Sequence, residues 1–364
     1  MAETRKTTRE DVLLQTRLFA EGVRYVVKGT PLWDPVPEGE PKAPIVVLDG
    51  CELYCRAREN QRSRIDVIMD GNDVTISEMG EIIGTGKLEP RASWRDALMS
   101  DGTIVDSAYM GGSFGAGSSW SDISISSHCN ACIAGGACKF CGAGVVYAQG
   151  QVMSLNETLA VNERQIEATA VAIQNGWSGM ILFVGGATPL DRRDQWTTDL
   201  FEAIMTRLHK YLDDDVLSQQ DIRSYVYPPN DLGEMYKWKH LGVSIAMYDC
   251  QIMDPAYFKA ICPGRGDQKR WFEAQEAAVE VFGSCVGNIV AGLEPMAGML
   301  EGIEERVSKG VSVAPSIFEP MKGTPLEGMQ PATAEWYMEA WEKTSEIYER
   351  HGYDSRLAYD LPKT

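Results

Sequence analysis

The sequence predicts an α/β fold, namely a TIM-type (β/α) barrel, full or partial, that follows an N-terminal α+β extension. From residue 121 onward, apolar strand patterns alternate with amphipathic helix patterns, which is typical of parallel strands joined by helical crossovers. The 236 residues from Cys129 to Thr364 are about what such a barrel requires. Apolar residues make up 44% of the 364 residues and charged residues 24%, which excludes a disordered chain. We therefore expect an accessory or cover extension over residues 1–120 and the barrel over 121–364.

The extension begins with an amphipathic pattern over residues 9–29, which predicts a helix ending near Gly29. A Pro-rich loop and a short strand, PIVVLDG, follow it. Apolar and polar residues then alternate on both sides of Asp70-Gly71-Asn72-Asp73, which indicates a β-hairpin. The stretch 101–120 is rich in Gly and Ser and predicts a loop or cover segment.

The barrel region contains six strand patterns and six helix patterns in alternation. We expect strands at 121–127, 179–186, 222–229, 243–249, 288–294 and 311–320, and helices at 156–176, 196–212, 232–242, 267–283, 296–310 and 332–352. In a barrel of this kind, functional side chains lie at the C-terminal ends of the strands. We judge every candidate residue by that criterion.

The charge balance and the chain start limit the partners and the compartment. Acidic residues number 52 and basic residues 34, and a net charge of -18 argues against a nucleic-acid partner. The start, MAETRKTTREDVLLQ, has no apolar core of signal-peptide length, and no apolar run approaches the roughly 18 residues of a membrane span. We expect a cytoplasmic protein with no membrane or nucleic-acid partner.

Four of the nine cysteines crowd between Cys129 and Cys141, directly after the first barrel strand. Thiolates at such short spacing suit a soft metal or an iron–sulfur cluster, because a tight loop brings several sulfurs to one centre. A zinc site that uses both Cys-x2-Cys pairs is an alternative, although their five-residue separation is shorter than is usual for four-cysteine zinc modules. A ferredoxin-like site with four thiolates is another alternative.

Cys132, Cys138 and Cys141, with Phe140 before the last cysteine, are similar to the cluster loop of radical S-adenosylmethionine (SAM) enzymes. The common spacing in that superfamily is Cys-x3-Cys-x2-Cys, whereas this sequence has Cys-x5-Cys-x2-Cys. The resemblance implies three thiolates on a 4Fe-4S cluster whose fourth iron binds SAM. Cys129 is then interpreted as a spare thiol.

The resemblance covers roughly residues 121–335 and is closest to the biotin synthase, [FeFe]-hydrogenase maturase and methylornithine synthase group. ILFVGGATPLD resembles the second-strand Gly-Gly-Glu segment, with Ala187 in place of the usual Glu. It implies that Gly185 and Gly186 flank the methionyl end of SAM and that the backbone at Phe140 lies beside adenine. VSIAMYDCQIMD resembles the fourth-strand segment, so Asp249 is the candidate residue for the SAM ribose or for catalysis on the substrate.

The resemblance implies reductive cleavage of SAM to a 5′-deoxyadenosyl radical, protected from oxygen, which abstracts hydrogen from a small molecule during biosynthesis of a cofactor or metabolite. It implies an electron donor such as a ferredoxin or flavodoxin. The x5 spacing favours the enzyme of iron-guanylylpyridinol cofactor biosynthesis as the specific hypothesis. A maturase-like or mutase-like rearrangement and a non-enzymatic iron–sulfur or zinc scaffold are the alternatives.

Several further residues have two interpretations. Cys51 and Cys55 would share one helical face if their segment were helical, and Cys250 could face the cavity or pack in the core. Buried packing is the favoured interpretation for Cys262 and Cys285. A solvated surface position is favoured over an anion site for a set of arginines near the strand ends: Arg192, Arg193, Arg265 and Arg270.

Overall fold

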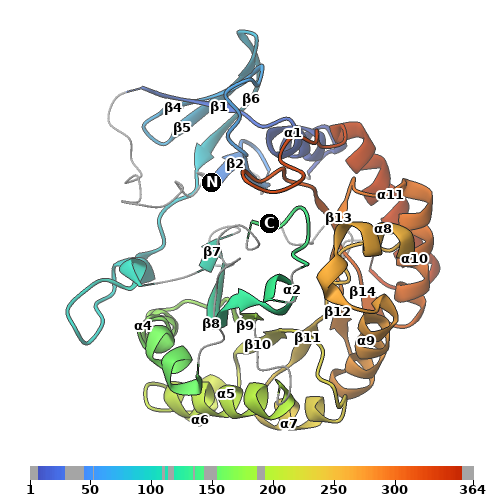
Figure 1. Cartoon of the computed structure of the whole chain (residues 1–364). Helices are drawn as coiled ribbons and strands as arrows, with labels where there is room; N and C mark the ends of the chain where they lie inside the picture. Colours follow the sequence, from blue (N-terminus) through green and yellow to red (C-terminus); the bar gives the residue numbers. More distant parts are fainter. Residues whose placement is uncertain are drawn as a thin grey trace.

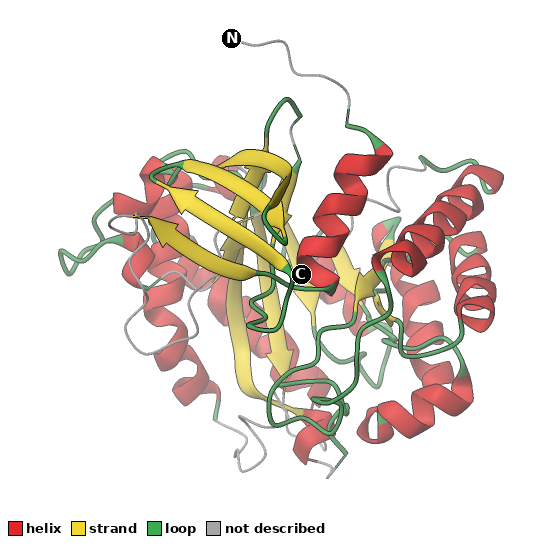
Figure 2. Cartoon of the chain, turned by 90° about the horizontal axis from the view of Figure 1, so that it is seen from above, coloured by secondary structure: helices red, strands yellow, loops and turns green. Residues whose placement is uncertain are grey.

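The computed structural model describes residues 7–28, 45–51, 53–108, 111–113, 119–133, 136–142, 154–186 and 193–354. These residues form a mixed N-terminal sheet and a larger sheet of mainly parallel strands, with helices along the outer side of the latter (Figure 1). Figure 2 shows the same arrangement from above, with helices flanking the strands on the outside. No helix in the described residues is long and apolar enough to cross a membrane.

The N-terminal sheet has six strands in the order β1-β4-β5-β6-β2-β3. The predicted hairpin is confirmed, because β4 and β5 pair antiparallel around Gly71-Asn72 and Gly71 has a φ of +62°. The predicted strand PIVVLDG is also confirmed. The element bounds are α1 Arg9–Ala20, β1 Arg24–Lys28, β2 Ile45–Leu48, β3 Tyr54–Arg56, β4 Ile65–Asp70, β5 Asp73–Glu78 and β6 Glu81–Leu88.

The helix predicted over residues 9–29 is wrong in its second half. Helix α1 ends at Ala20. Gly22 has a φ of +74°, which lies in the left-handed region that glycine adopts readily. Residues 24–28 form β1, which pairs parallel to β4. Tyr25, Val26 and Val27 favour a strand once β4 offers a partner, so tertiary pairing overrides the helical spacing.

The conditional helical interpretation of the Cys51–Cys55 segment is also wrong. Cys51 lies in the connection after β2, and Cys55 lies in β3, which pairs antiparallel with β2. Both thiols are buried in the core of the N-terminal sheet, which supports the packing interpretation.

The larger sheet has seven strands in the order β14-β12-β11-β10-β9-β8-β7, all parallel except the edge strand β7. Among the described residues β7 and β14 are its edges, so the fold is a partial (β/α) barrel and not a closed one. The bounds are β7 Gly111–Ser113, β8 Ser119–Cys129, β9 Met180–Gly186, β10 Asp221–Tyr225, β11 Ile245–Met247, β12 Cys285–Val286 and β14 Val311–Ser312.

The predicted strand 311–320 is divided into β14 and β15, whereas the predicted strand 288–294 contains β13 alone, and β12 before it was not predicted. β13 (Ile289–Ala291) and β15 (Pro315–Ile317) pair with each other in a separate two-stranded sheet beyond β12 and β14. Gly287 lies at the break between β12 and β13, where an added Cβ would be 2.4 Å from the Gln275 amide nitrogen. That amide donates to the Tyr248 carbonyl at 2.7 Å, so a buried side chain occupies the space at the break.

The six predicted helices of the barrel region are confirmed, with ends shifted by a few residues. Ser154 and Glu157 form a capping box at the start of α4, and α9 ends at Gly283, which has a φ of +86°. These helices are α4 Leu155–Gln174, α5 Arg193–Leu208, α7 Glu234–His240, α9 Gln268–Phe282, α10 Met296–Ser308 and α11 Ala334–Arg350. Short helices that the sequence did not predict are α2 Asn130–Ile133, α6 Asp214–Leu217, α8 Pro255–Ile261, and the 3-10 helices η1 Ser93–Asp96, η2 Val105–Ser107 and η3 Pro263–Arg265.

The extension and the barrel region pack against each other. Trp94, Met99 and Val105 belong to the barrel core, and the Trp94 ring lies 6.4 Å from that of Trp177. The predicted loop segment 101–120 therefore contributes core residues, η2, β7 and the start of β8, with residues 109–110 and 114–118 outside the described set. The division at residue 120 stays a prediction.

Candidate active site

The cysteine segment begins where β8 ends. Cys129 is the last residue of β8 and lies opposite Gly186, the last residue of β9, in the parallel register. Cys132 lies in the short helix α2, and Cys138 and Cys141 lie in the loop that follows it. Because the carboxyl ends of parallel strands meet at one edge, the predicted positions Gly185 and Gly186 adjoin the cysteine segment, as expected for a barrel site.

The thiols of this segment lie close enough to influence one another. Cys132 and Cys141 are half-buried and Cys138 is buried. Burial raises the pKa of Cys132, and the neighbouring Cys129, Cys141 and Cys138 raise it further. Cys132 therefore lies within electrostatic range of the other three thiols.

Cys138 has a different environment from Cys132. A hydrogen bond from the Cys262 thiol lowers the pKa of Cys138, and the Arg265 guanidinium lowers it further, whereas burial opposes both. The pKa of Cys262 is correspondingly raised by its hydrogen bond to Cys138.

The cysteine loop is attached by its backbone to the segment after β11. Gly264 N donates to the Gly136 carbonyl at 2.8 Å, and Lys139 N donates to the Ile261 carbonyl at 2.9 Å. A Cβ on Gly136 would lie 2.5 Å from Gly264 N, so only glycine permits this approach.

Arg265 is enclosed at the site and is not a solvated surface residue, so that favoured interpretation is wrong. Its guanidinium lies 3.8 Å from the Trp271 ring centroid and 5.6 Å from that of Tyr227. Its Nη2 donates to the Asp249 carbonyl at 2.5 Å. Burial alone lowers the pKa of Arg265, but Cys138 and Tyr227 outweigh this effect and raise it.

Asp249 is almost fully buried, and both of its carboxylate oxygens have partners. Oδ2 accepts a hydrogen bond from the Tyr225 hydroxyl at 2.5 Å, and Oδ1 accepts one from Asn288 N at 2.8 Å. Burial raises the pKa of Asp249, although the bond from Tyr225 opposes the shift. Asp249 lies at the predicted strand end, and its contact with SAM or substrate stays a prediction.

Tyr225 and Tyr227 are site residues that the sequence analysis missed. The Tyr227 hydroxyl accepts from Ala131 N at 3.1 Å and lies 3.6 Å from the Cys129 sulfur. The sequence does hold a signal for this pair, because tyrosines at i and i+2 at the end of a strand point to the same face.

The remaining candidates divide into packing residues and residues near the site. Cys250 and Cys285 are fully buried, which supports the packing interpretation. Arg270 Nη2 donates to the carbonyls of Pro229 and Asn230 at 2.8 and 2.6 Å. Phe140 is half-buried against the barrel core, and its role beside adenine stays a prediction. Ala187 and Arg192 lie outside the described residues.

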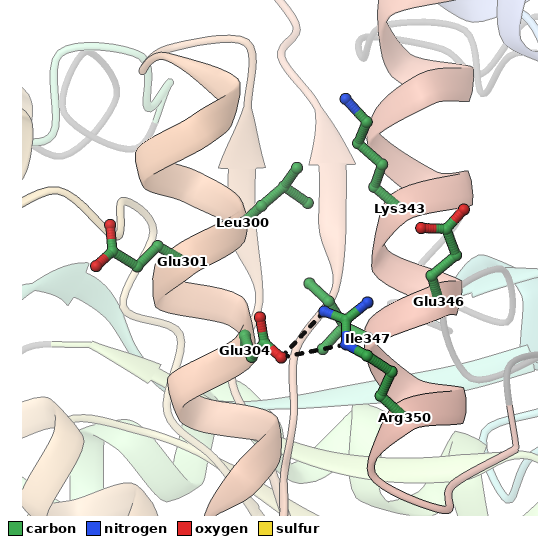
Figure 3. Close-up of a pocket in the computed structure, with 7 residues that line it drawn as sticks. All are labelled: Leu300, Glu301, Glu304, Lys343, Glu346, Ile347 and Arg350. Carbon is green, nitrogen blue, oxygen red and sulfur yellow. Dashed lines mark hydrogen bonds and ion pairs between the residues drawn. The ribbon is translucent and has the colours of Figure 1, made fainter.

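A groove of about 380 Å³ lies elsewhere, between α10 and α11. Figure 3 shows its charged lining, in which Glu304 of α10 pairs with Arg350 of α11 at 3.0 Å, and Lys343 lies on the same helix as Arg350. None of the elements that carry the clustered cysteines contributes to this groove. It is therefore separate from the candidate active site.

No protein-family model matches the chain. The FeFe-hydrogenase maturase HydG from Carboxydothermus hydrogenoformans is 16% identical, with a TM-score of 0.47, and the match covers 66% of this chain and 51% of that one. Methylornithine synthase (PylB) is 14% identical, with a TM-score of 0.44, covering 65% and 69%. Coproporphyrinogen III oxidase (HemN), a radical SAM enzyme from Escherichia coli, is 15% identical, with a TM-score of 0.43, covering 60% and 50%. This chain thus spans about half the length of the maturase and of the oxidase.

The bacteriochlorophyllide c C-7(1)-hydroxylase of Chlorobaculum limnaeum is 34% identical over 376 residues, which cover 99% of this chain and 90% of the hydroxylase. A partial (β/α) barrel with several thiols in the segment after β8 can hold an iron–sulfur cluster. The chain belongs to the family of this hydroxylase. Membership in a hydroxylase family confirms the prediction of an enzyme over the non-enzymatic scaffold, whereas the radical SAM superfamily, the 4Fe-4S cluster and SAM stay predictions.

The residues of the site fit the predicted 4Fe-4S cluster and SAM. Cys132 in α2 and Cys138 and Cys141 in the loop after it offer soft sulfur ligands. In the described part of the chain, no three His, Cys, Asp or Glu side chains converge as they would around a single metal ion. A cluster of several irons is bound by cysteines that stand apart from one another.

Proposed function

We propose that the enzyme hydroxylates a carbon substituent of a chlorophyllide-type tetrapyrrole. The observation that carries this proposal is the 34% identity to bacteriochlorophyllide c C-7(1)-hydroxylase along 99% of the chain. The match covers nearly the whole chain, so it includes the N-terminal extension. The iron-guanylylpyridinol hypothesis has no such support and is not retained, and neither is a rearrangement.

The proposed reaction balances without an external oxidant. SAM, a C–H substrate and water give methionine, 5′-deoxyadenosine, the alcohol and a proton, so water supplies the oxygen atom. The bound cluster and SAM supply a radical able to abstract hydrogen from an unactivated carbon. The protein has to hold the reacting atoms at near-attack distance and exclude bulk water from the site.

Each site residue has a proposed role. Cys132, Cys138 and Cys141 hold the cluster, and Cys129 stays a thiol beside Tyr227. The backbone of Phe140 lies beside adenine, Gly185 and Gly186 flank the methionyl group, and Asp249 contacts ribose or substrate. The close register of Gly186 with Cys129 supports the placement of the glycines. We further propose a ferredoxin or flavodoxin as electron donor, a cytoplasmic location, and an accessory part over residues 1–120.

An anaerobic assay with bacteriochlorophyllide c tests the proposal. Reconstituted protein should bind about four irons per chain. With dithionite and SAM it should release 5′-deoxyadenosine and a pigment heavier by one oxygen atom, and isotopically labelled water should transfer its oxygen to the pigment. A Cys132→Ala variant serves as the inactive control. Deoxyadenosine release that is not stimulated by the pigment, with the pigment mass unchanged, would contradict the proposed substrate.

A further inference from the structure

Arg193 is a half-buried cation that forms no ion pair with a carboxylate of the described residues. Its Nη2 atom donates to the Oδ1 atom of Asn230, and its Nε atom is buried and has no acceptor in the described part of the chain. The adjacent Asp194 bonds instead to the backbone nitrogens of Asn230 and Asp231, at 2.7 Å each. In a chain with a net charge of -18, this guanidinium therefore keeps donors for a ligand.

Arg193 lies at the carboxyl ends of the parallel strands. It is the first residue of α5, the helix that follows β9. Trp196 and Thr197, three and four residues further along the helix, are both buried. Residues at these spacings share one face of a helix, so Arg193 lies on the face of α5 that packs inward.

Asn230, the partner of Arg193, is held by two helices. Asp194 of α5 accepts its backbone N–H, as described above, and Arg270 of α9 donates from Nη2 to the carbonyls of Pro229 and Asn230 at 2.8 and 2.6 Å. The segment after β10 is thus fixed from both sides, and the direction of the Arg193 side chain is fixed with it. A donor that is already held in place loses little conformational entropy when a ligand binds.

The same segment reaches the candidate active site. Tyr227 lies three residues before Asn230, and its hydroxyl accepts from Ala131 N at 3.1 Å and lies 3.6 Å from the Cys129 sulfur. The Tyr227 ring lies 5.1 Å from that of Trp271, the neighbour of Arg270. Arg193 and the cysteine segment therefore lie at the same edge of the sheet.

The surroundings of Arg193 suit a negatively charged ligand. Burial lowers the pKa of Arg193, and the charge of Asp194 opposes that shift. A cation partly removed from water attracts an anion more strongly than an exposed one, because less water screens the pair. A guanidinium also presents planar N–H donors that match the two oxygens of a carboxylate. A local cation of this kind offsets the repulsion that an acidic chain exerts on an anionic substrate.

We propose that Arg193 binds a carboxylate group of the substrate and so sets the position of the substrate at the strand ends. Arg270 and Asp194 are positioning residues, since they hold Asn230 and through it Arg193. This inference rests on the proposed function, because a chlorophyllide carries a free side-chain carboxylate where the corresponding chlorophyll carries an ester. It extends that function by naming the group of the substrate that the protein recognises.

The test is an anaerobic binding titration of the reconstituted protein with SAM, followed by the absorption of the pigment. The two probes are bacteriochlorophyllide c and its methyl ester, which lacks the negative charge. Arg193→Met removes the cation, whereas Arg193→Lys keeps the charge and loses the planar fork. Arg350→Met is the matched control, because it removes a guanidinium that pairs with Glu304 in the groove between α10 and α11.

Wild-type protein should bind the free acid about tenfold more tightly than the ester, as expected for loss of one hydrogen-bonded charge pair. Arg193→Met should bind the acid about tenfold more weakly than wild type and the ester equally well, with Arg193→Lys in between and Arg350→Met like wild type. Equal affinity of wild type for acid and ester would overturn the proposal, and so would an undiminished preference for the acid in Arg193→Met. Should Arg193→Met fail to fold, the comparison of acid and ester in wild type and in Arg193→Lys decides the question.

The same titration separates this inference from the proposed function. A preference for the acid that depends on Arg193, without hydroxylation of the pigment, would support the carboxylate site and contradict the proposed reaction. Hydroxylation of acid and ester with equal affinity would support the reaction and overturn the carboxylate site. Failure of wild type to bind either pigment would overturn both.

Discussion

The contact between Gly136 and Gly264 gives the sharpest stability prediction, because the atoms that surround it are backbone atoms. In Gly264→Ala the new Cβ would lie 2.4 Å from the Gly136 carbonyl oxygen and 2.6 Å from that of Ala131. Ordinary contact starts near 3.4 Å, so the loop and η3 must separate by about 1 Å. That movement breaks the 2.8 Å hydrogen bond from Gly264 N to Gly136.

The size of the effect follows from these two losses. A lost hydrogen bond costs about 1 kcal/mol and steric overlap in a packed site about 1–3 kcal/mol. The state in which the cysteine loop contacts η3 should therefore become less favourable by about 2 kcal/mol or more. This lowers the equilibrium constant for that contact roughly thirtyfold. Neither glycine is part of the barrel core, so the loss should appear in retention of the cluster more than in global unfolding.

The assay is iron retention under an anaerobic chelator titration, with thermal unfolding measured by circular dichroism alongside it. Gly264→Ala should lose iron at a chelator concentration roughly thirtyfold lower than wild type. Gly328→Ala is the control, because nothing lies within 4 Å of a Cβ added there. Iron retention in Gly264→Ala equal to that of Gly328→Ala would refute the reasoning.

Three further predictions concern single side chains. Alanine at Cys132, Cys138 or Cys141 should abolish deoxyadenosine release, whereas Cys129→Ala should keep the iron content and the release of wild type. Loss of release in Cys129→Ala would contradict the ligand assignment. Burial raises the pKa of Asp249 above 3.8, because it disfavours the charged carboxylate in the folded protein. The folded protein is therefore most stable with respect to Asp249 below pH 3.8, and it loses this contribution to the free energy of unfolding as the pH rises through the folded-state pKa. Asp249→Asn should therefore flatten the pH dependence of thermal unfolding and be at least as stable as wild type at neutral pH, whereas a less stable variant there would show that the carboxylate is needed. Ser154→Ala removes the capping box with Glu157 and should lower the free energy of unfolding by about 1 kcal/mol in chemical denaturation, with no change in iron content; an unchanged midpoint would contradict the cap.

Most of the fold could be predicted from local patterns. The alternation of strands and helices after residue 121 predicted the parallel sheet and its six long helices, because each of these elements has its own hydrophobic period. The helix over residues 9–29 was predicted too long for the same reason. Its apolar spacing is compatible with a helix, and only pairing with β4 makes residues 24–28 a strand.

The strand divisions near Gly287 and the openness of the barrel could not be predicted. At Gly287 the division depends on the Gln275 side chain, which comes from another element and fills the space beside the glycine. A barrel closes only if its first and last strands pair with each other. No local sequence pattern encodes a pairing between strands so far apart in the chain.

The sequence by itself predicted the type of site, because closely spaced cysteines after a strand, Cys132, Cys138 and Cys141, are typical of iron–sulfur ligands. The tertiary structure decided what surrounds those thiols. Cys262 and Arg265 lie more than a hundred positions further along the chain, and they reach Cys138 only because the segment after β11 folds back against the cysteine loop. Side chains that meet through such long-range contacts leave no local pattern, which is why Arg265 was interpreted as a surface residue from the sequence and is enclosed in the folded protein.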